Sequence, residues 1–144
     1  MAVAYDPENV FAKILRGEIP SYKVYEDDAA LAIMDIMPRS EGHVLVIPKK
    51  PARGLLDIAP DDLAALIKRV QHVAKAAKTA FNADGITLQQ FNESAGGQVI
   101  FHLHFHILPR FEGVALRPPG AMGDQEKLKA QAEKIRAALE MFAG

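Results

Sequence analysis

Three histidines stand at a spacing of two residues in the segment FHLHFHILPR, residues 101–110. His102, His104 and His106 alternate with apolar side chains, which is the pattern of a half-buried strand, so we expect all three imidazoles on one face. At a strand rise of about 3.3 Å per residue, neighbouring histidines lie about 6.6 Å apart and the outer two about 13 Å apart. That spacing decides which ligands the row could bind.

A single metal ion fits this spacing poorly. Zinc–nitrogen bonds are about 2.0 to 2.1 Å long, so one ion could hold two adjacent histidines of a strand but not readily all three. An extended ligand fits better, because successive imidazoles can each act as nucleophile, hydrogen-bond donor or acid. We therefore predict that a phosphate ester lies along the strand. A solvated, histidine-rich strand face is the alternative, although histidines are uncommon in strands.

The rest of the chain predicts the elements that hold this strand. Period-two patterns bounded by turn residues predict strands over 22–25, 29–35, 43–48, 85–92 and 100–108. Apolar residues at helical spacing predict a long central helix over 61–81, an N-terminal helix that Asp6 caps and Gly17 ends, and a C-terminal helix from Asp124. We expect a single α+β domain over residues 1–144, with a mainly antiparallel five-stranded sheet and the helices on one side.

The composition is that of an ordinary globular protein of 144 residues, with 49% hydrophobic and 24% charged residues and a formal net charge of -1. No basic surplus indicates a nucleic-acid partner, and no run approaches the roughly 20 apolar residues of a membrane span. The opening MAVAYDPENV lacks the pattern of a secretory signal, and the absence of cysteine is compatible with a reducing compartment. We expect a cytoplasmic protein with no nucleic-acid or membrane partner.

The histidine row lies inside a longer motif. AGGQVIFHLHFHILPR, residues 95–110, resembles the signature of the histidine triad (HIT) family, in which the histidines follow a glycine–glutamine turn. FAKI at 11–14, GEIP at 17–20, VYEDD at 24–28 and GHVLVIPK at 42–49 resemble the Hint branch of that family. Together these blocks span residues 10–110, which is most of the chain.

The resemblance implies a nucleotide hydrolase that acts on the α-phosphate of purine nucleoside phosphoramidates or related adenylates, which are derivatives of AMP or GMP. The central histidine, here His104, would attack the phosphate and form a nucleotidyl-histidine that water cleaves. His106 matches the histidine that hydrogen-bonds the phosphate and assists the leaving group, His102 the supporting one, and His43 a fourth histidine of the site. The resemblance implies no metal and no other cofactor, and it implies a homodimer.

The same resemblance assigns the nucleotide-binding residues. An acidic side chain is a good acceptor for two ribose hydroxyls, and Asp35 matches that position. A flexible glycine turn can present backbone N–H groups to an oxyanion. The remaining matches are Gly97, Gln98 and the backbone of Val99 for the phosphate, Asn92 near the phosphate, and Val10, Phe11 and Ile36 for the base.

One departure from the family pattern stands at Val99, where many Hint and Fhit proteins have serine or threonine. The missing hydroxyl could supply a hydrogen bond to a charged group, which is worth about 1.5 to 3 kcal/mol. Strand alternation places Val99 with Phe101 and Leu103, opposite the histidines, whereas the bend at 96–97 could break that count. Both orientations stay open from the sequence.

Three other functions stay open as well. A dinucleoside polyphosphate hydrolase would use the same histidines on a different leaving group. A nucleotide-binding regulatory protein would keep the fold with slow or incidental turnover. A metal-binding module would use two of the three histidines. The absence of cysteine removes every thiolate zinc site. The loop at 117–120 could cover its own site or reach a neighbour's.

Overall fold

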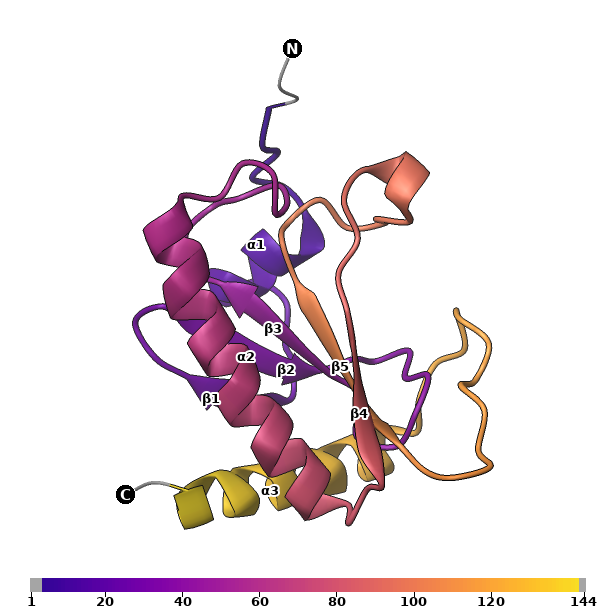
Figure 1. Ribbon diagram of the computed structural model, residues 1–144. Coiled ribbons are helices and arrows are strands. Elements are labelled where there is room, and N and C mark those ends of the chain that lie inside the picture. The colour runs from indigo at the N-terminus through magenta and orange to yellow at the C-terminus, as the bar shows by residue number, and fades with distance from the viewer. Residues whose placement is uncertain (1–3, 143–144) are drawn as a thin grey trace.

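The computed structural model describes residues 4–142, and residues 1–3 and 143–144 of the predicted domain lie outside the described part. Five strands form one sheet in the order β1-β2-β3-β5-β4, and every neighbouring pair is antiparallel (Figure 1). The predicted α+β fold is confirmed. Its elements are α1 (Val10–Leu15), β1 (Lys23–Glu26), β2 (Ala30–Met34), β3 (Val44–Pro48), α2 (Pro60–Ala80), β4 (Gly85–Gln89), the 3-10 helix η1 (Ser94–Gly96), β5 (Phe105–Arg110) and α3 (Gln125–Phe142).

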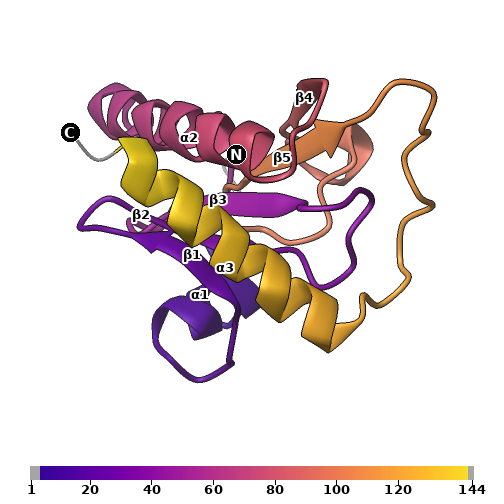
Figure 2. The same cartoon turned by 90° about the horizontal axis from the view of Figure 1, so that it is seen from below.

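The sheet is covered on both faces because β2 and β3 are buried at every position. Alternate residues of a strand point to opposite sides. Ala32 and Val46 pack with α2 and α3 in one core, while Leu31 and Ile47 pack with α1 in a second cluster. Figure 2 shows α1 and α2 on opposite sides of the sheet. The prediction that the helices lie on one side is therefore wrong for α1, which shields Leu31 and Ile47 from water.

The helix α2 is the long helix that the apolar spacing predicts, displaced by one residue at each end. Pro60 stands at its start, where a missing N–H costs no helical hydrogen bond, and Asp61 and Asp62 complement the positive end of the helix dipole. Leu66 and Val70 are buried against the sheet. Burial of such a side chain contributes about 1.5 to 3 kcal/mol. None of the described helices is long and apolar enough to cross a membrane.

The helix α1 begins later than predicted. Its N-cap is Asn9, whose side-chain oxygen accepts the Ala12 N–H at 2.9 Å. Asp6 does not cap the helix, because its carboxylate accepts the Glu8 N–H at 2.9 Å in a separate turn. That turn also brings Asn9 N–H to within 3.3 Å of the Asp6 carbonyl. The turn moves the N-cap three residues along the chain, from Asp6 to Asn9.

The strand β5 also begins later than predicted, at Phe105 and not at Ile100. The Leu103 N–H donates to the carbonyl of Ala52 at 2.8 Å, outside the sheet ladder. Alternation nevertheless continues through this segment, because Leu103 and Phe105 both enter the core under α2 and α3. The histidines therefore share the opposite face as predicted, but only His106 lies in a strand.

Candidate active site

His104 has a fixed tautomer. Its Nδ1 lies 2.7 Å from the backbone carbonyl of His102, and a carbonyl can only accept, so Nδ1 carries the hydrogen. The lone pair of Nε2 is then left for an incoming group. The ring packs edge-on against Phe11, with 4.9 Å between centroids. Burial lowers the pKa of His104 below its usual range, although the hydrogen bond to the His102 carbonyl opposes that shift. The lowered pKa keeps the imidazole neutral near pH 7.

His102 uses both ring nitrogens within the protein. Its Nε2 lies 2.8 Å from the carbonyl of Pro48, so this nitrogen carries the hydrogen. Its Nδ1 therefore accepts, and the Tyr5 hydroxyl donates to it at 2.6 Å. The side chain has no exposed surface, and burial lowers the pKa of His102. No ring nitrogen of His102 is left for a ligand, which suits a supporting role.

His106 belongs to a second chain of hydrogen bonds. The Arg39 backbone N–H donates to Nδ1 of His43 at 3.1 Å, so His43 carries its hydrogen on Nε2. That nitrogen lies 2.9 Å from Nδ1 of His106 and 3.4 Å from Oδ2 of Asp35. His106 then accepts at Nδ1 and carries its own hydrogen on Nε2. Because its ring lies 5.0 Å from that of His104, a donor stands beside a nucleophile.

This second chain is buried and uncharged at its histidines. Burial, reinforced by the neighbouring His106 and by Arg39, lowers the pKa of His43 to about 3. Burial, reinforced by His104 and Arg39, lowers the pKa of His106 to about 4. Burial raises the pKa of Asp35, although the Met37 N–H hydrogen bond opposes that shift. The contact of 3.4 Å between His43 and Asp35 is therefore a close approach of a neutral imidazole to the carboxyl group and not an ion pair at pH 7.

The glycine turn before the histidines is closed by its own hydrogen bonds. The N–H groups of Gly97 and Gln98 donate to Ser94 and Glu93 at 3.0 Å. Gly97 has a φ of 97°, a left-handed conformation that favours glycine. The N–H of Val99 has no partner among the hydrogen bonds of residues 4–142. Of the backbone donors predicted for a phosphate, Val99 is thus the one left available.

The side chain of Gln98 braces this turn. Its Oε1 accepts the Glu93 N–H at 2.8 Å, and its Nε2 donates to the carbonyls of Arg53 and Ile100 at 2.7 and 3.0 Å. Both amide hydrogens are therefore in use, and a contact with phosphate would have to replace one of these two hydrogen bonds.

The side chain of Val99 is 83% exposed, so it does not point into the core.

The other predicted binding residues border this cluster in different ways. Phe11 is buried against His104, whereas Val10 and Ile36 are about half exposed, at 45% and 46%. Asn92 is held by Gln90, to which its Nδ2 donates at 2.7 Å, and its Oδ1 accepts the backbone N–H of Leu55 at 2.8 Å. The four histidines, Asp35 and Phe11 are thus joined directly, while Asn92 and Gln98 support loops.

The sheet order, the two covered faces and the histidine cluster agree with one family. The model of the HIT domain matches residues 16–113, which is more than half of the chain. The chain belongs to the HIT domain family. The resemblance to the HIT family that the sequence motifs predicted is thereby confirmed.

Several relatives of known name share this HIT domain. The adenylylsulfatase HINT3 of Arabidopsis thaliana is 46% identical over 103 residues, which are 72% of this chain and 52% of that protein. The adenosine 5'-monophosphoramidase HNT1 of Candida albicans is 34% identical over 137 residues, which are 90% of each chain. A crystal structure of a Hit-like protein involved in cell-cycle regulation from Bartonella henselae has 57% identity and a TM-score of 0.91, covering 94% of this chain and 99% of that one.

A metal ion has one group of possible ligands among the described residues. Ligand atoms of Asp35, His43 and His106 lie within 4.8 Å of one another. The Arg39 N–H holds His43 with its hydrogen on Nε2, so a metal at that nitrogen would require the other tautomer and the loss of that hydrogen bond. A zinc-bound HIT protein from Mycobacterium smegmatis is 34% identical, with a TM-score of 0.84, covering 94% of this chain and 95% of that one. Metal independence therefore stays a prediction.

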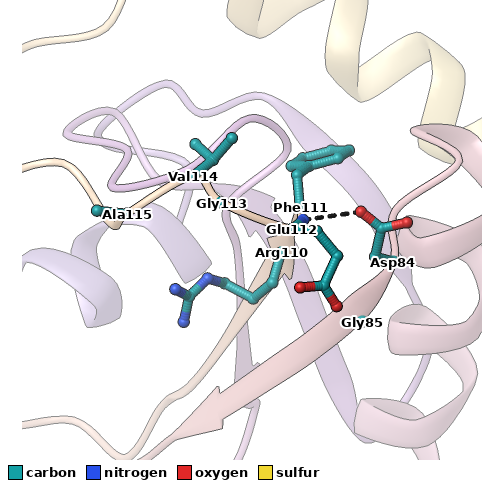
Figure 3. A pocket seen from close by; sticks show the side chains of 8 residues that line it. All are labelled: Asp84, Gly85, Arg110, Phe111, Glu112, Gly113, Val114 and Ala115. Atoms are coloured by element: carbon teal, nitrogen blue, oxygen red, sulfur yellow. Dashed lines mark hydrogen bonds between the residues drawn. The ribbon is translucent and has the colours of Figure 1, made fainter.

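A cavity of about 450 Å³ lies at the opposite end of β5 from the histidines. Figure 3 shows Arg110 and Glu112 beside it, with the Glu112 N–H donating to Asp84 at 2.8 Å. Arg110 follows His106 by four residues, which is about 13 Å along a strand. None of the predicted site residues lines this cavity, so the cavity and the histidines lie at different ends of β5.

Sequence reasoning missed three groups that hold the histidines. The Tyr5 hydroxyl, the Pro48 carbonyl and the Arg39 N–H each fix one ring nitrogen. Two of these groups belong to the backbone, which has no side-chain signature. Tyr5 lies 97 residues from its partner, so no local pattern links the two.

Proposed function

We propose that this protein is a nucleotide hydrolase that acts on the α-phosphate of purine nucleoside phosphoramidates or related adenylates. The names of two relatives support this substrate class, an adenylylsulfatase and an adenosine 5'-monophosphoramidase. Both names describe cleavage of a group from the phosphate of an adenylate. The four histidines, three of them buried and His106 partly buried, have neutral rings and fixed hydrogens and supply the groups that such a cleavage needs.

The reaction proceeds in two displacements. The Nε2 lone pair of His104 attacks phosphorus, and the bond to the leaving nitrogen breaks while the Nε2–H of His106 gives its proton to that nitrogen, which leaves as the amine. Water then attacks phosphorus and returns a proton to Nε2 of His106, the bond to His104 breaks, and the nucleoside monophosphate leaves. The oxygen of that water ends on phosphorus, and His104 and His106 regain their starting protonation. Covalent catalysis thus divides one difficult step into two easier ones.

The phosphate is held by backbone and side-chain donors. The free N–H of Val99 and the Nε2–H of His106 stabilise the negative charge that develops on the phosphate oxygens. Asp35 accepts the ribose hydroxyls, and Phe11, Val10 and Ile36 form the apolar slot for the base. Because Val10 and Ile36 are about half exposed, this slot opens to solvent and accepts a planar ring from outside.

The proposal depends most on one hydrogen bond, from Nδ1 of His104 to the His102 carbonyl at 2.7 Å. This bond leaves the opposite nitrogen as a neutral nucleophile. The group of possible metal ligands, Asp35, His43 and His106, does not include this nitrogen, and a regulatory nucleotide-binding protein would not need it either. The arrangement is therefore explained best by covalent chemistry at His104.

A substrate panel tests the proposal. The protein is incubated with adenosine phosphoramidate, adenosine phosphosulfate, adenylated lysine and diadenosine polyphosphates, and AMP release is followed for each with and without a chelator. We expect the highest kcat/KM on one of the first three and no effect of the chelator. Cleavage of diadenosine polyphosphates alone would favour the alternative hydrolase. Nucleotide binding without turnover would favour a regulatory protein, and loss of activity to the chelator would require a metal.

We also infer that the chain forms a homodimer. Within residues 4–142, β4 is an edge strand that pairs with β5 alone, and its Leu88 is 47% exposed. Ile67 on α2 is 41% exposed as well. An open edge strand with apolar side chains favours pairing with a second copy. Sedimentation of the wild-type protein is expected to give a dimer and Leu88→Lys a monomer, whereas a monomeric wild type would contradict the inference.

A further inference from the structure

The segment before α1 reaches the histidine cluster through one side chain. Tyr5 places its hydroxyl 2.6 Å from Nδ1 of His102, and the two rings meet edge-on with 5.6 Å between centroids. The turn that follows Tyr5 is anchored, because Arg16 donates to the Pro7 carbonyl at 2.7 Å. The HIT domain match begins at residue 16, so Tyr5 lies outside the matched region.

The hydroxyl of Tyr5 holds the second ring nitrogen of His102, in the tautomer that the Pro48 carbonyl selects. The Pro48 carbonyl accepts from Nε2, which leaves a lone pair on Nδ1 of a ring with no exposed surface. Such a buried acceptor needs a donor, and Tyr5 supplies it. Without the hydroxyl, the imidazole could turn or exchange tautomers, because only one of its two nitrogens would still be held.

A change at His102 reaches the nucleophile through the backbone. The carbonyl of His102 accepts the Nδ1–H of His104 at 2.7 Å, and this bond aims the free nitrogen of His104. We infer that Tyr5 is a positioning residue for nucleotidyl transfer, which together with the Pro48 carbonyl holds the tautomer and ring of His102 and thereby the direction of His104. The inference rests on the proposed function, since it concerns the attack by His104. Tyr5 itself touches no substrate.

The chain offers a matched control for this contact. Tyr25 also donates its hydroxyl at 2.6 Å, to Asp27, and is likewise partly buried. Tyr25 lies in β1, at the far edge of the sheet from the histidines of β5. Tyr5→Phe and Tyr25→Phe each keep the ring and delete one hydroxyl. They differ in whether that hydroxyl touches the triad.

The test compares the full chain with these two variants in three measurements. Nitrogen-15 shifts of the histidine rings report the tautomer of His102, steady-state kinetics on adenosine phosphoramidate report kcat and KM, and calorimetry reports AMP affinity. For Tyr5→Phe we expect a mixed tautomer at His102 and a kcat lower by about tenfold, the loss of one hydrogen bond acting on the transition state. KM and AMP affinity should stay within about twofold. Tyr25→Phe should change none of these quantities.

Two results would overturn the inference. One is an unchanged His102 tautomer in Tyr5→Phe, and the other is an equal loss of kcat in both variants, which would reflect general stability. A wild-type protein without turnover on any substrate would instead contradict the proposed function. In that case the ring-nitrogen shifts alone decide whether Tyr5 fixes His102.

Discussion

The two ends of β5 differ in what they offer a ligand. At the end nearer Gly97, His104 is buried and His106 is partly buried, both have fixed hydrogens, and their ring centroids lie 5.0 Å apart. At the other end, Arg110 and Glu112 border a cavity of about 450 Å³ that none of the predicted site residues lines. This cavity therefore lies away from the histidines.

The positions of the ring hydrogens therefore indicate the proposed site better than the volume of a cavity does. Three imidazoles of the cluster meet a backbone group that can act only as donor or only as acceptor, and His106 meets the Nε2–H that the Arg39 N–H fixes on His43. These partners select a nucleophile at His104 and a donor at His106, with neutral rings at pH 7. Among residues 4–142 the cavity end has no comparable chain of hydrogen bonds, because Arg110 donates to the hydroxyl of Thr87 and not to a nucleophile.

The largest expected effect is the loss of the nucleophile at the histidine end. In His104→Ala, turnover of adenosine phosphoramidate should fall by at least about 10³-fold, because no group replaces the attacking nitrogen. AMP affinity should change little, because the other contacts remain. Steady-state kinetics and calorimetry measure both quantities. Full activity in His104→Ala would remove covalent catalysis from the account.

The second prediction concerns how the free energy of unfolding depends on pH, because the histidines at the same end are shielded from water. His43 and His106 have folded pKa values of about 3 and about 4, below the ordinary value of 6.5. The unfolded chain binds more protons below pH 6.5, so the free energy of unfolding falls as pH falls from 6.5 toward these values. Each histidine contributes up to about 1.4 kcal/mol per pH unit. Asp35, whose pKa is raised, opposes this trend at lower pH.

Urea unfolding at intervals between pH 7 and pH 5 measures this loss. The variant His43→Gln should reduce the slope, since one titrating ring is gone. Equal stability across this range would show that the histidines are hydrated and would weaken the contrast with the cavity end.

The third prediction concerns the ribose. Asp35→Ala should weaken AMP by about 10-fold to 100-fold, the value of a hydrogen bond to a charged acceptor, and should weaken deoxy-AMP much less. Calorimetric titration of both nucleotides distinguishes these outcomes. If both lost affinity equally, Asp35 would act through His43, which lies 3.4 Å away, and not through the ribose.

A smaller gain is expected at Val99. Because Val99 is 83% exposed, Val99→Ser leaves no cavity in the core. The new hydroxyl stands beside the backbone N–H that has no partner within the described residues, so turnover of the phosphoramidate should rise by up to about tenfold. Equal kcat in Val99→Ser and Val99→Ala would mean that the phosphate meets only the backbone.

The smallest effect is expected at the cavity. Glu112→Ala removes an exposed side chain from its lining, and kcat and KM should stay within about twofold of the wild type. The same assay that follows His104→Ala measures this change. A loss of tenfold or more would place part of the reaction at the cavity end and would reverse the comparison.

Much of the fold could be predicted from the sequence because its signals are local. Apolar spacing predicted α2 to within one residue at each end, and alternation placed the three histidines on one face. Alternation could not show that the ladder starts only at Phe105, because side chains can alternate along an extended segment that lacks strand partners. The N–H of Leu103 bonds to Ala52, a contact that no periodicity reveals.

The sequence names the residues of the proposed site but does not show the hydrogen bonds that join them. His43 and His106 are 63 residues apart, and His102 and Pro48 are 54 apart, so their contacts depend on the folded sheet. Family resemblance supplied the histidines, while the tautomers came only from distances to carbonyls and N–H groups. Gln98 illustrates the difference, because its predicted phosphate contact competes with three hydrogen bonds inside the turn.

The central claim is that Nε2 of His104 forms a bond to phosphorus. The most direct measurement is a single turnover of adenosine phosphoramidate stopped at high pH, where phosphoryl-histidine bonds persist, followed by digestion and fragmentation mass spectrometry. The account predicts a covalent AMP on His104, separated by fragment ions from His102 and His106, and none in His104→Ala. Covalent AMP on another residue, or turnover that never leaves AMP on the protein, would contradict it.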